Sequence, residues 1–185
     1  MRIAASLVAI ALLTVAPAEA ADSVLHLTRT LPEHGPLVVP APMPEIGDWH
    51  SLKITLHRSM CFGRCPAYTV TVDGSGRVVF NGESDTAVQG EARRRISRAA
   101  VRRLYAAFRA AQFFSLRDEY RAQVTDLPEY RIGIAFDGTS KSVLDYAGPM
   151  AGMPQAVRDL EDLIDKTAGT AKWIKPMPRL PRPDR

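Results

Sequence analysis

The sequence predicts an α+β domain, an antiparallel sheet of about five strands with two helices packed on one face. Two observations lead to this fold class. Short segments with alternating apolar and polar residues, typical of half-buried strands, occur in two groups along the chain. Each group is followed by a segment whose apolar residues have helical spacing. A hairpin followed by a helix therefore occurs twice.

The first twenty residues have the pattern of a secretory signal peptide. Arg2 gives a positive start, residues 3–15 are almost wholly apolar, and Ala18 and Ala20 provide the small residues of a cleavage site. The apolar run is shorter than the roughly 20 residues that a membrane span requires. We expect cleavage after Ala20 and a periplasmic or secreted chain with no transmembrane segment. A short buried N-terminal helix is the alternative.

Proline-rich segments flank the predicted domain on both sides. Residues 21–48 contain five prolines, which break helices and central strands, so we expect an extended tether or a strap there. The domain is expected over residues 49–174. Residues 175–185 carry four prolines among basic residues, a composition that predicts a disordered or polyproline-like tail.

Strands are predicted wherever apolar and polar residues alternate between turn signals. Asp73-Gly74-Ser75-Gly76 and Asp137-Gly138 are strong turn signals, and each joins two strands into a hairpin. Residues 83–90 are ambiguous, with a short edge strand as one interpretation. Residues 117–127 have the composition of an ordered loop. The predicted strands cover residues 52–56, 68–72, 77–81, 130–136 and 141–146.

Two helices are predicted from apolar spacing and end signals. Ser97 can cap a helix that runs to about Gln112, with the apolar face at Val101, Leu104, Tyr105 and Phe108. Pro154 suits the first turn of the final helix, and Gly169 can end it. The apolar stripe of that helix is formed by Val157, Leu160 and Ile164.

The chain has two cysteines, Cys61 and Cys65, and only one intramolecular pairing is possible. In an oxidising compartment we expect a structural disulfide that closes a very small ring. Gly63 can adopt a positive φ that lets this loop fold back on itself. A redox-active pair is an alternative, although such pairs favour two intervening residues at a helix N-terminus rather than three between strands.

Two further interpretations of the cysteines stay open. His57, Cys61 and Cys65 follow one another at four-residue spacing, which on a helix would form part of a metal site. His57 lies at the end of a strand pattern, however, where that geometry fails, and an exposed strand-end residue is the simpler interpretation. Free, unpaired thiols are the remaining possibility.

The segment from Arg58 to Tyr68 resembles a known family signature. Its Cys-Phe-Gly-Arg-Cys-Pro-Ala-Tyr sequence is similar to the strand–Cys-Phe-Gly-x-Cys-Pro-x-Tyr–strand motif of DUF6438, a bacterial domain of unknown function. The resemblance covers about residues 50–174 and implies those domain limits, with no assigned activity and no catalytic residues. Weaker similarities lie at the Gly82 region, Phe114, Tyr120, Thr125-Asp126-x-Pro128, Asp145-Tyr146, Ile164-Asp165 and Trp173.

Four polar residues are candidates for a binding or structural role: Arg58, Tyr68, Asp126 and Asp145. Asp145 lies in a predicted strand, and an inward-pointing carboxylate would need a partner, for which Arg58 is a candidate. Asp126 precedes Leu127-Pro128 and is typical of a residue that caps or braces a loop. Glu161 and Asp165 lie four residues apart in the final helix, the pattern of a solvated surface.

The region of the first helix is basic. Arg94, Arg98 and Arg102 are spaced by four residues, so they would align on a helix and contact an envelope protein or an anionic surface. The simpler interpretation is the solvated face of an amphipathic helix. No aromatic residues interleave with these arginines in the way that favours binding to nucleic acid.

The sequence contains no nucleotide-binding loop, no GxSxG elbow and no HExxH pair. The net charge of +4 is modest and does not by itself imply a nucleic-acid partner. We therefore expect a non-enzymatic periplasmic binding or accessory module, with no cofactor and no metal. The alternative function is a thiol–disulfide redox protein that uses Cys61 and Cys65.

Overall fold

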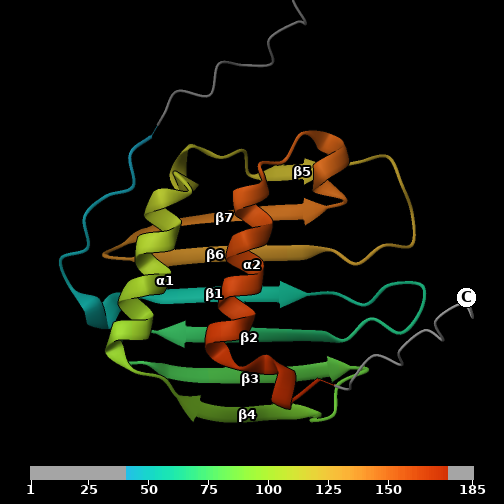
Figure 1. Ribbon diagram of the computed structural model, residues 1–185, viewed down its shortest axis with the longest axis horizontal. Helices are drawn as coiled ribbons and strands as arrows, with labels where there is room; N and C mark the ends of the chain where they lie inside the picture. The colour runs from blue at the N-terminus through green and yellow to red at the C-terminus, as the bar shows by residue number, and fades with distance from the viewer. Residues whose placement is uncertain (1–40, 175–185) are drawn as a thin grey trace, which may run out of the picture. The chain divides into compact units, whose positions relative to one another are not determined.

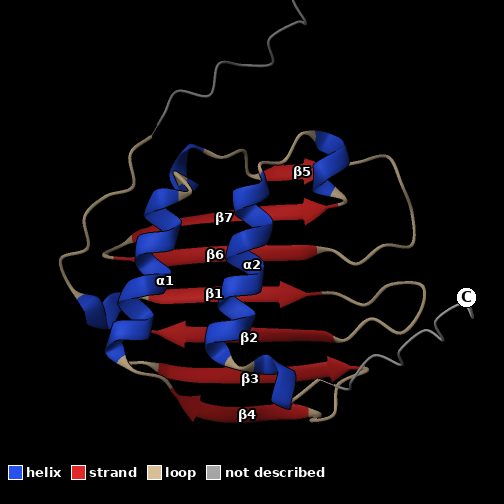
Figure 2. Cartoon of the chain, in the orientation of Figure 1, coloured by secondary structure: helices blue, strands red, loops and turns tan. Residues whose placement is uncertain are grey.

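The computed structural model describes residues 41–174, and Figures 1 and 2 show one sheet with two helices on one of its faces. The predicted signal peptide, most of the predicted tether and the predicted tail lie outside the described residues. The strands are β1 (Lys53–Arg58), β2 (Ala67–Asp73), β3 (Arg77–Ser84), β4 (Gly90–Arg95), β5 (Glu119–Arg121), β6 (Tyr130–Phe136) and β7 (Thr139–Tyr146). The helices are α1 (Arg98–Ala110) and α2 (Gln155–Ala168), with short 3-10 turns at Trp49–Ser51, Phe113–Ser115, Gly148–Ala151 and Thr170–Lys172.

The predicted α+β class with two helices on one face is confirmed, although the sheet has seven strands rather than about five. Its strand order is β4-β3-β2-β1-β6-β7-β5. All neighbouring pairs are antiparallel except β5 and β7, which are parallel, so the sheet is mixed. Both predicted hairpins form, β2 with β3 and β6 with β7.

The two further strands, β4 and β5, lie at the edges of the sheet, and the ambiguous residues 83–90 form the end of β3, the connection after it and the first residue of β4. β4 reads Gly-Glu-Ala-Arg-Arg-Arg and has none of the apolar alternation that marks a half-buried strand. Backbone pairing with β3 places it in the sheet, and its charged side chains suit an exposed edge. β5 is only three residues long and lies within the segment predicted to be a loop.

Both predicted helices form, although α1 ends at Ala110 rather than at about Gln112 and Pro154 lies just before the first turn of α2. The Ser97 hydroxyl accepts a hydrogen bond from the Ala100 amide at 3.2 Å and caps α1. α2 follows Pro154 and ends at Gly169, which adopts the left-handed φ of 71° that glycine tolerates. None of the helices within residues 41–174 is long and apolar enough to cross a membrane.

The hydrophobic core lies between the helices and the face of the sheet that they cover. The apolar residues predicted for both helix faces are buried, together with the inward residues of the central strands. The opposite face of β1 and β2 carries partly exposed polar residues, among them Thr55, His57, Thr69 and Thr71. The described part of the chain therefore has two layers, and no residue within 41–174 forms a layer on the opposite face of the sheet.

Residues 41–48 contact the domain and belong to the segment predicted to be an extended tether or a strap. Met43 is 9% exposed and belongs to the core. The Tyr105 hydroxyl donates to the Pro44 carbonyl at 3.0 Å, and the Asp137 carboxylate accepts from the Gly47 amide at 2.6 Å. This segment is a strap across α1 and the β6–β7 turn.

Candidate functional site

The connection between β1 and β2, residues 59–66, forms a loop that is closed by a disulfide. Cys61 and Cys65 are bonded, with their Cα atoms 5.6 Å apart, so the predicted pairing is present. Gly63, between them, has a φ of 155°, a conformation that other residues rarely adopt. The four-residue spacing to His57 does not form a metal site, because both sulfurs are bonded to each other and His57 faces Thr69 across the strands.

A second loop, residues 122–129, holds the cysteine loop in place. The Ser59 amide donates to the Glu129 carbonyl at 2.9 Å, and the Glu129 amide donates to the Ser59 hydroxyl at 2.8 Å. The Phe62 amide donates to the Asp126 carbonyl at 3.1 Å. Asp126 adopts a left-handed φ of 69°, which Asp accepts more readily than most residues. Asp126 therefore contacts the cysteine loop through its backbone carbonyl and not through its carboxylate.

These two loops display apolar side chains to solvent. Phe62 is 88% exposed, Met60 is 65% exposed and Leu127 is 45% exposed. We call these three residues the apolar tip. Within residues 41–174 only one other large apolar side chain, Met150, is exposed, and it lies after β7. Single exposed apolar residues are common on proteins, whereas these three lie on two loops that are joined by backbone hydrogen bonds.

A row of polar residues lies beneath the loops on the helix-covered face of the sheet. Tyr68, Arg58, Tyr130 and Asp145 are directly opposite one another on β2, β1, β6 and β7. Directly opposite residues share a face, so their side chains are neighbours. The Arg58 guanidinium lies 4.3 Å from the centre of the Tyr130 ring. Three of the four predicted polar candidates, Arg58, Tyr68 and Asp145, are therefore brought into one row.

Asp165 on α2 binds one end of this row. Its carboxylate accepts from Arg58 Nε at 3.0 Å and from Arg58 Nη2 at 2.7 Å. It also accepts from the Tyr68 hydroxyl at 2.7 Å and from the Thr170 hydroxyl at 2.8 Å. The interpretation of Asp165 as a solvated surface residue is wrong, and the partner of Arg58 is Asp165 rather than Asp145. Burial raises the pKa of the Tyr68 hydroxyl and Asp165 raises it further, so Tyr68 remains a donor.

Two carboxyl groups are buried at the other end of the row. Asp145 is 1% exposed and Glu161, on α2, is 3% exposed. Asp145 Oδ1 accepts from the Gly148 amide at 2.6 Å, and Oδ2 lies 3.8 Å from Nε of Arg158. Burial raises the pKa of Glu161 to about 8, and the neighbouring Asp145 carboxylate adds to the rise. The surface interpretation of Glu161 is therefore also wrong.

The polar row has the properties of an internal brace. Asp165 is saturated with donors from Arg58, Tyr68 and Thr170, so it is not a free base. Asp145 and Glu161 are too deeply buried for a substrate to reach. Within residues 41–174, no three His, Cys, Asp or Glu side chains are placed to hold a metal ion. The row ties α2 to the strand ends that carry the cysteine loop.

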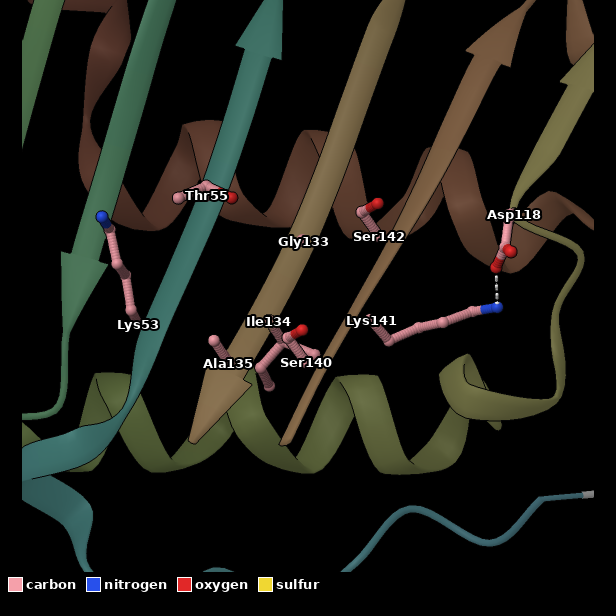
Figure 3. Close-up of a pocket in the computed structure, with 9 residues that line it drawn as sticks. All are labelled: Lys53, Thr55, Asp118, Gly133, Ile134, Ala135, Ser140, Lys141 and Ser142. Atoms are coloured by element: carbon pink, nitrogen blue, oxygen red, sulfur yellow. Dashed lines mark hydrogen bonds and ion pairs between the residues drawn. The ribbon is translucent and has the colours of Figure 1, made fainter. Parts of the chain in front are cut away.

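The open face of the sheet has a shallow hollow of about 440 Å³, shown in Figure 3. Gly133 lies at its centre between Thr55 and Ser142 and is buried, because Thr55 Oγ1 occupies the space that a side chain at this position would need. Lys53 lies at one side, while Lys141 is paired with Asp118 at the other. The hollow is lined by hydroxyl groups and by Lys53, for which no ion pair is found within residues 41–174.

The three arginines predicted to align do not lie on one helix. Arg94 belongs to β4 and donates to the Ala168 carbonyl at 3.2 Å. Arg98 is the first residue of α1, and Arg102 stacks on the Trp49 ring at 4.5 Å. Only Arg98 and Arg102 share a helix, because the chain leaves β4 at Arg95 before α1 begins.

Comparisons with known proteins agree with the resemblance of the cysteine motif. A comparison with curated proteins finds no match to the chain. A family model, described as a domain of unknown function, DUF6438, matches residues 52–168. The match spans every strand and both helices described above, with the cysteine loop and the polar row inside it. The chain therefore belongs to the DUF6438 family.

Proposed function

We propose that this protein is an exported binding or accessory module, periplasmic or secreted, with no enzymatic activity of its own. The pattern of residues 1–20 supports export. The disulfide supports it too, because such bonds persist mainly in oxidising compartments. The partner binds at the apolar tip, formed by Met60, Phe62 and Leu127.

The observation that carries this proposal is the exposure of Phe62. Removing an aromatic side chain of this size from water is favourable by about 1.5–3 kcal/mol, and the fold leaves this free energy unused. The disulfide and the contacts with residues 122–129 hold the loop in one conformation. A preorganised loop loses little conformational entropy when a partner binds.

The buried polar groups support a binding role over a catalytic one. A catalytic acid or base must reach its substrate, whereas Asp145 and Glu161 are almost fully buried. Arg58, Tyr68 and Asp165 bond to one another. Their contacts fix α2 against the strands that present the loop, so their contribution to function is to position the apolar tip.

Site-specific photocrosslinking in living cells tests the proposal. A photoreactive amino acid replaces Phe62 in the full chain, and a matched control carries it at Met150, which is 72% exposed. We expect discrete adducts, to protein or to lipid, from position 62 and not from position 150. Equal labelling from the two positions, or none from either, would contradict the proposal.

Measuring the reduction potential of the Cys61–Cys65 disulfide distinguishes the proposed binding function from the alternative, a thiol–disulfide redox protein. A structural bond is expected below about −300 mV, whereas thiol oxidoreductases lie near −120 to −200 mV. We expect the lower value, because the pair lies in a loop between two strands and not at a helix N-terminus, where the dipole would stabilise a thiolate. A value in the higher range would favour the redox function instead.

Export is tested by fractionation and by the mass of the isolated protein. The expected result is a chain in the periplasm or the medium that begins at Ala21 and has no free thiol. An unprocessed chain in the cytosol would contradict this part of the proposal.

A further inference from the structure

We propose that the surface which receives the apolar tip is an anionic lipid bilayer. This inference rests on the proposed function and names the class of partner. Two features carry it: the three apolar side chains displayed by the paired loops, and the basic sequence that follows Ile174, the last described residue, which itself lies at the same end of the sheet.

The apolar tip is suited to a partner without a complementary shape. A specific protein interface buries about 800 Å² on each side, far more than three side chains provide. A bilayer accepts apolar side chains at its interface without shape matching, and Phe, Leu and Met are typical of such contacts. Because the Cys61–Cys65 ring and the Phe62–Asp126 hydrogen bond hold the loops together, the three side chains can insert as one unit.

Basic residues adjoin this end of the domain. Arg64, within the cysteine loop, is exposed. The described chain ends at Ile174, which pairs with Thr86 just beyond the end of β3. That end of β3 pairs with the start of β2, where the cysteine loop returns to the sheet. The eleven residues that follow contain four basic residues and one acidic residue: Lys175, Arg179, Arg182, Arg185 and Asp184.

Apolar insertion and basic attraction reinforce each other on an anionic membrane. A single weak anchor gives marginal and reversible binding, so stable attachment takes two signals, such as an apolar anchor together with a polybasic segment. Basic residues near the surface are drawn to anionic headgroups within about a Debye length. Exposed Asp126, next to Leu127, and exposed Glu83, near the end of β3, oppose this attraction, so their charges limit the affinity.

Vesicle flotation of the full mature chain, with its disulfide intact, tests the inference. The probes are vesicles of phosphatidylcholine alone and vesicles of equal parts phosphatidylcholine and phosphatidylglycerol. We expect binding to the anionic vesicles, with Phe62→Ala weakening it by about tenfold or more.

The charged residues are tested by two further variants. Replacing Lys175, Arg179, Arg182 and Arg185 with Gln is expected to weaken binding at least tenfold and to reduce its salt dependence. Asp126→Asn is expected to strengthen it by up to about fivefold.

Met150→Ala is the matched control, because Met150 is exposed but belongs to neither of the two loops that carry the apolar tip, and its binding should equal that of the unmodified chain. Phe62 makes no core contact, so Phe62→Ala should unfold at the same denaturant concentration as the parent.

Failure to bind anionic vesicles, or binding unaffected by Phe62→Ala, would overturn the inference. If photocrosslinks from position 62 then reach only proteins, the proposed function stands without a lipid partner. The absence of specific crosslinks as well would overturn both.

Discussion

Asp165 is the residue on which the polar contacts beneath the cysteine loop converge. Its side chain is 19% exposed and that of Arg58 is 15% exposed, so both charges have lost most of their water. Two buried charges stabilise a fold only when each finds enough hydrogen bonds to offset the loss of hydration. Asp165 meets this condition with donors from Arg58, Tyr68 and Thr170.

Removing Asp165 should therefore be costly. We expect Asp165→Ala to lower the free energy of unfolding by about 3–5 kcal/mol, because it leaves the Arg58 charge buried without a partner. Urea unfolding measures the change. The control is Arg77→Ala, which breaks the exposed Arg77–Asp73 pair and should cost less than about 1 kcal/mol. If the two variants lost equal free energies of unfolding, the buried Arg58–Asp165 pair would stabilise the fold no more than an exposed pair does.

Glu161 should make stability depend on pH. Its pKa is raised by burial, and further by Asp145, from 4.5 to about 8, so the native state holds the proton more tightly than the unfolded chain. The stabilisation from this group is complete below about pH 4.5 and is lost as the pH rises through about 8.

We expect Glu161→Gln to remove this loss, so that its stability exceeds that of the parent by a few kcal/mol above pH 8. Urea unfolding at several pH values from 5 to 9 measures the difference. Asp159→Asn, an exposed change on the same helix, is the control and should follow the parent curve. Parallel curves for parent and Glu161→Gln would contradict the raised pKa.

The burial of Glu161 could have been found from the sequence. Residues 157, 160, 161 and 164 fall on one face of a helix, so Glu161 lies inside the apolar stripe. The four-residue spacing between Glu161 and Asp165, taken alone, instead predicts that both residues lie on a solvated surface. Asp165 borders that stripe, but its contacts with Arg58 and Tyr68 join residues about a hundred positions apart, and local pattern carries no information on such pairings.

At the scale of elements, the sequence pattern predicts the strands and helices that bury apolar side chains in the core. It misses the strands that join the sheet mainly through backbone hydrogen bonds. The five predicted strands and both helices have apolar residues at the right period, and all form. β4 and β5 have no such period, because they lie at the edges of the sheet and join it mainly through backbone hydrogen bonds. The predicted alignment of Arg94 with Arg98 is wrong because Arg94 lies in β4, before the Ser97 cap that the sequence also indicates as the start of α1.

The cysteine loop should be stabilised locally by its disulfide. A ring this small restricts the unfolded chain modestly, so we expect Cys61→Ser combined with Cys65→Ser to cost about 2 kcal/mol while the fold is kept. Urea unfolding measures the loss. Hydrogen exchange should accelerate at the Ser59 and Phe62 amides and stay unchanged in the central strands. Failure of the variant to unfold cooperatively would contradict a local role.

At the scale of the whole molecule, the strap formed by residues 41–48 decides where the folding unit begins. The sequence places the domain start near Trp49, since prolines break the pattern before it. Met43 nevertheless belongs to the core, and the strap supplies the carbonyl that accepts from Tyr105. Proline content excludes helix and central strand, but it does not exclude an extended segment that buries a side chain.

A chain that begins at Trp49 should therefore be less stable than one that begins at Ala41. Met43→Ala alone should cost about 2 kcal/mol, because it leaves a cavity between the strap and the core. Removing the whole strap should cost more, since the Tyr105 hydroxyl also loses its acceptor and Asp137 loses the Gly47 amide. Urea unfolding of the three chains measures this order. Equal midpoints for the chains that begin at residues 41 and 49 would restrict the folding unit to the sheet and its helices, and the strap would then be a tether that only rests on the surface.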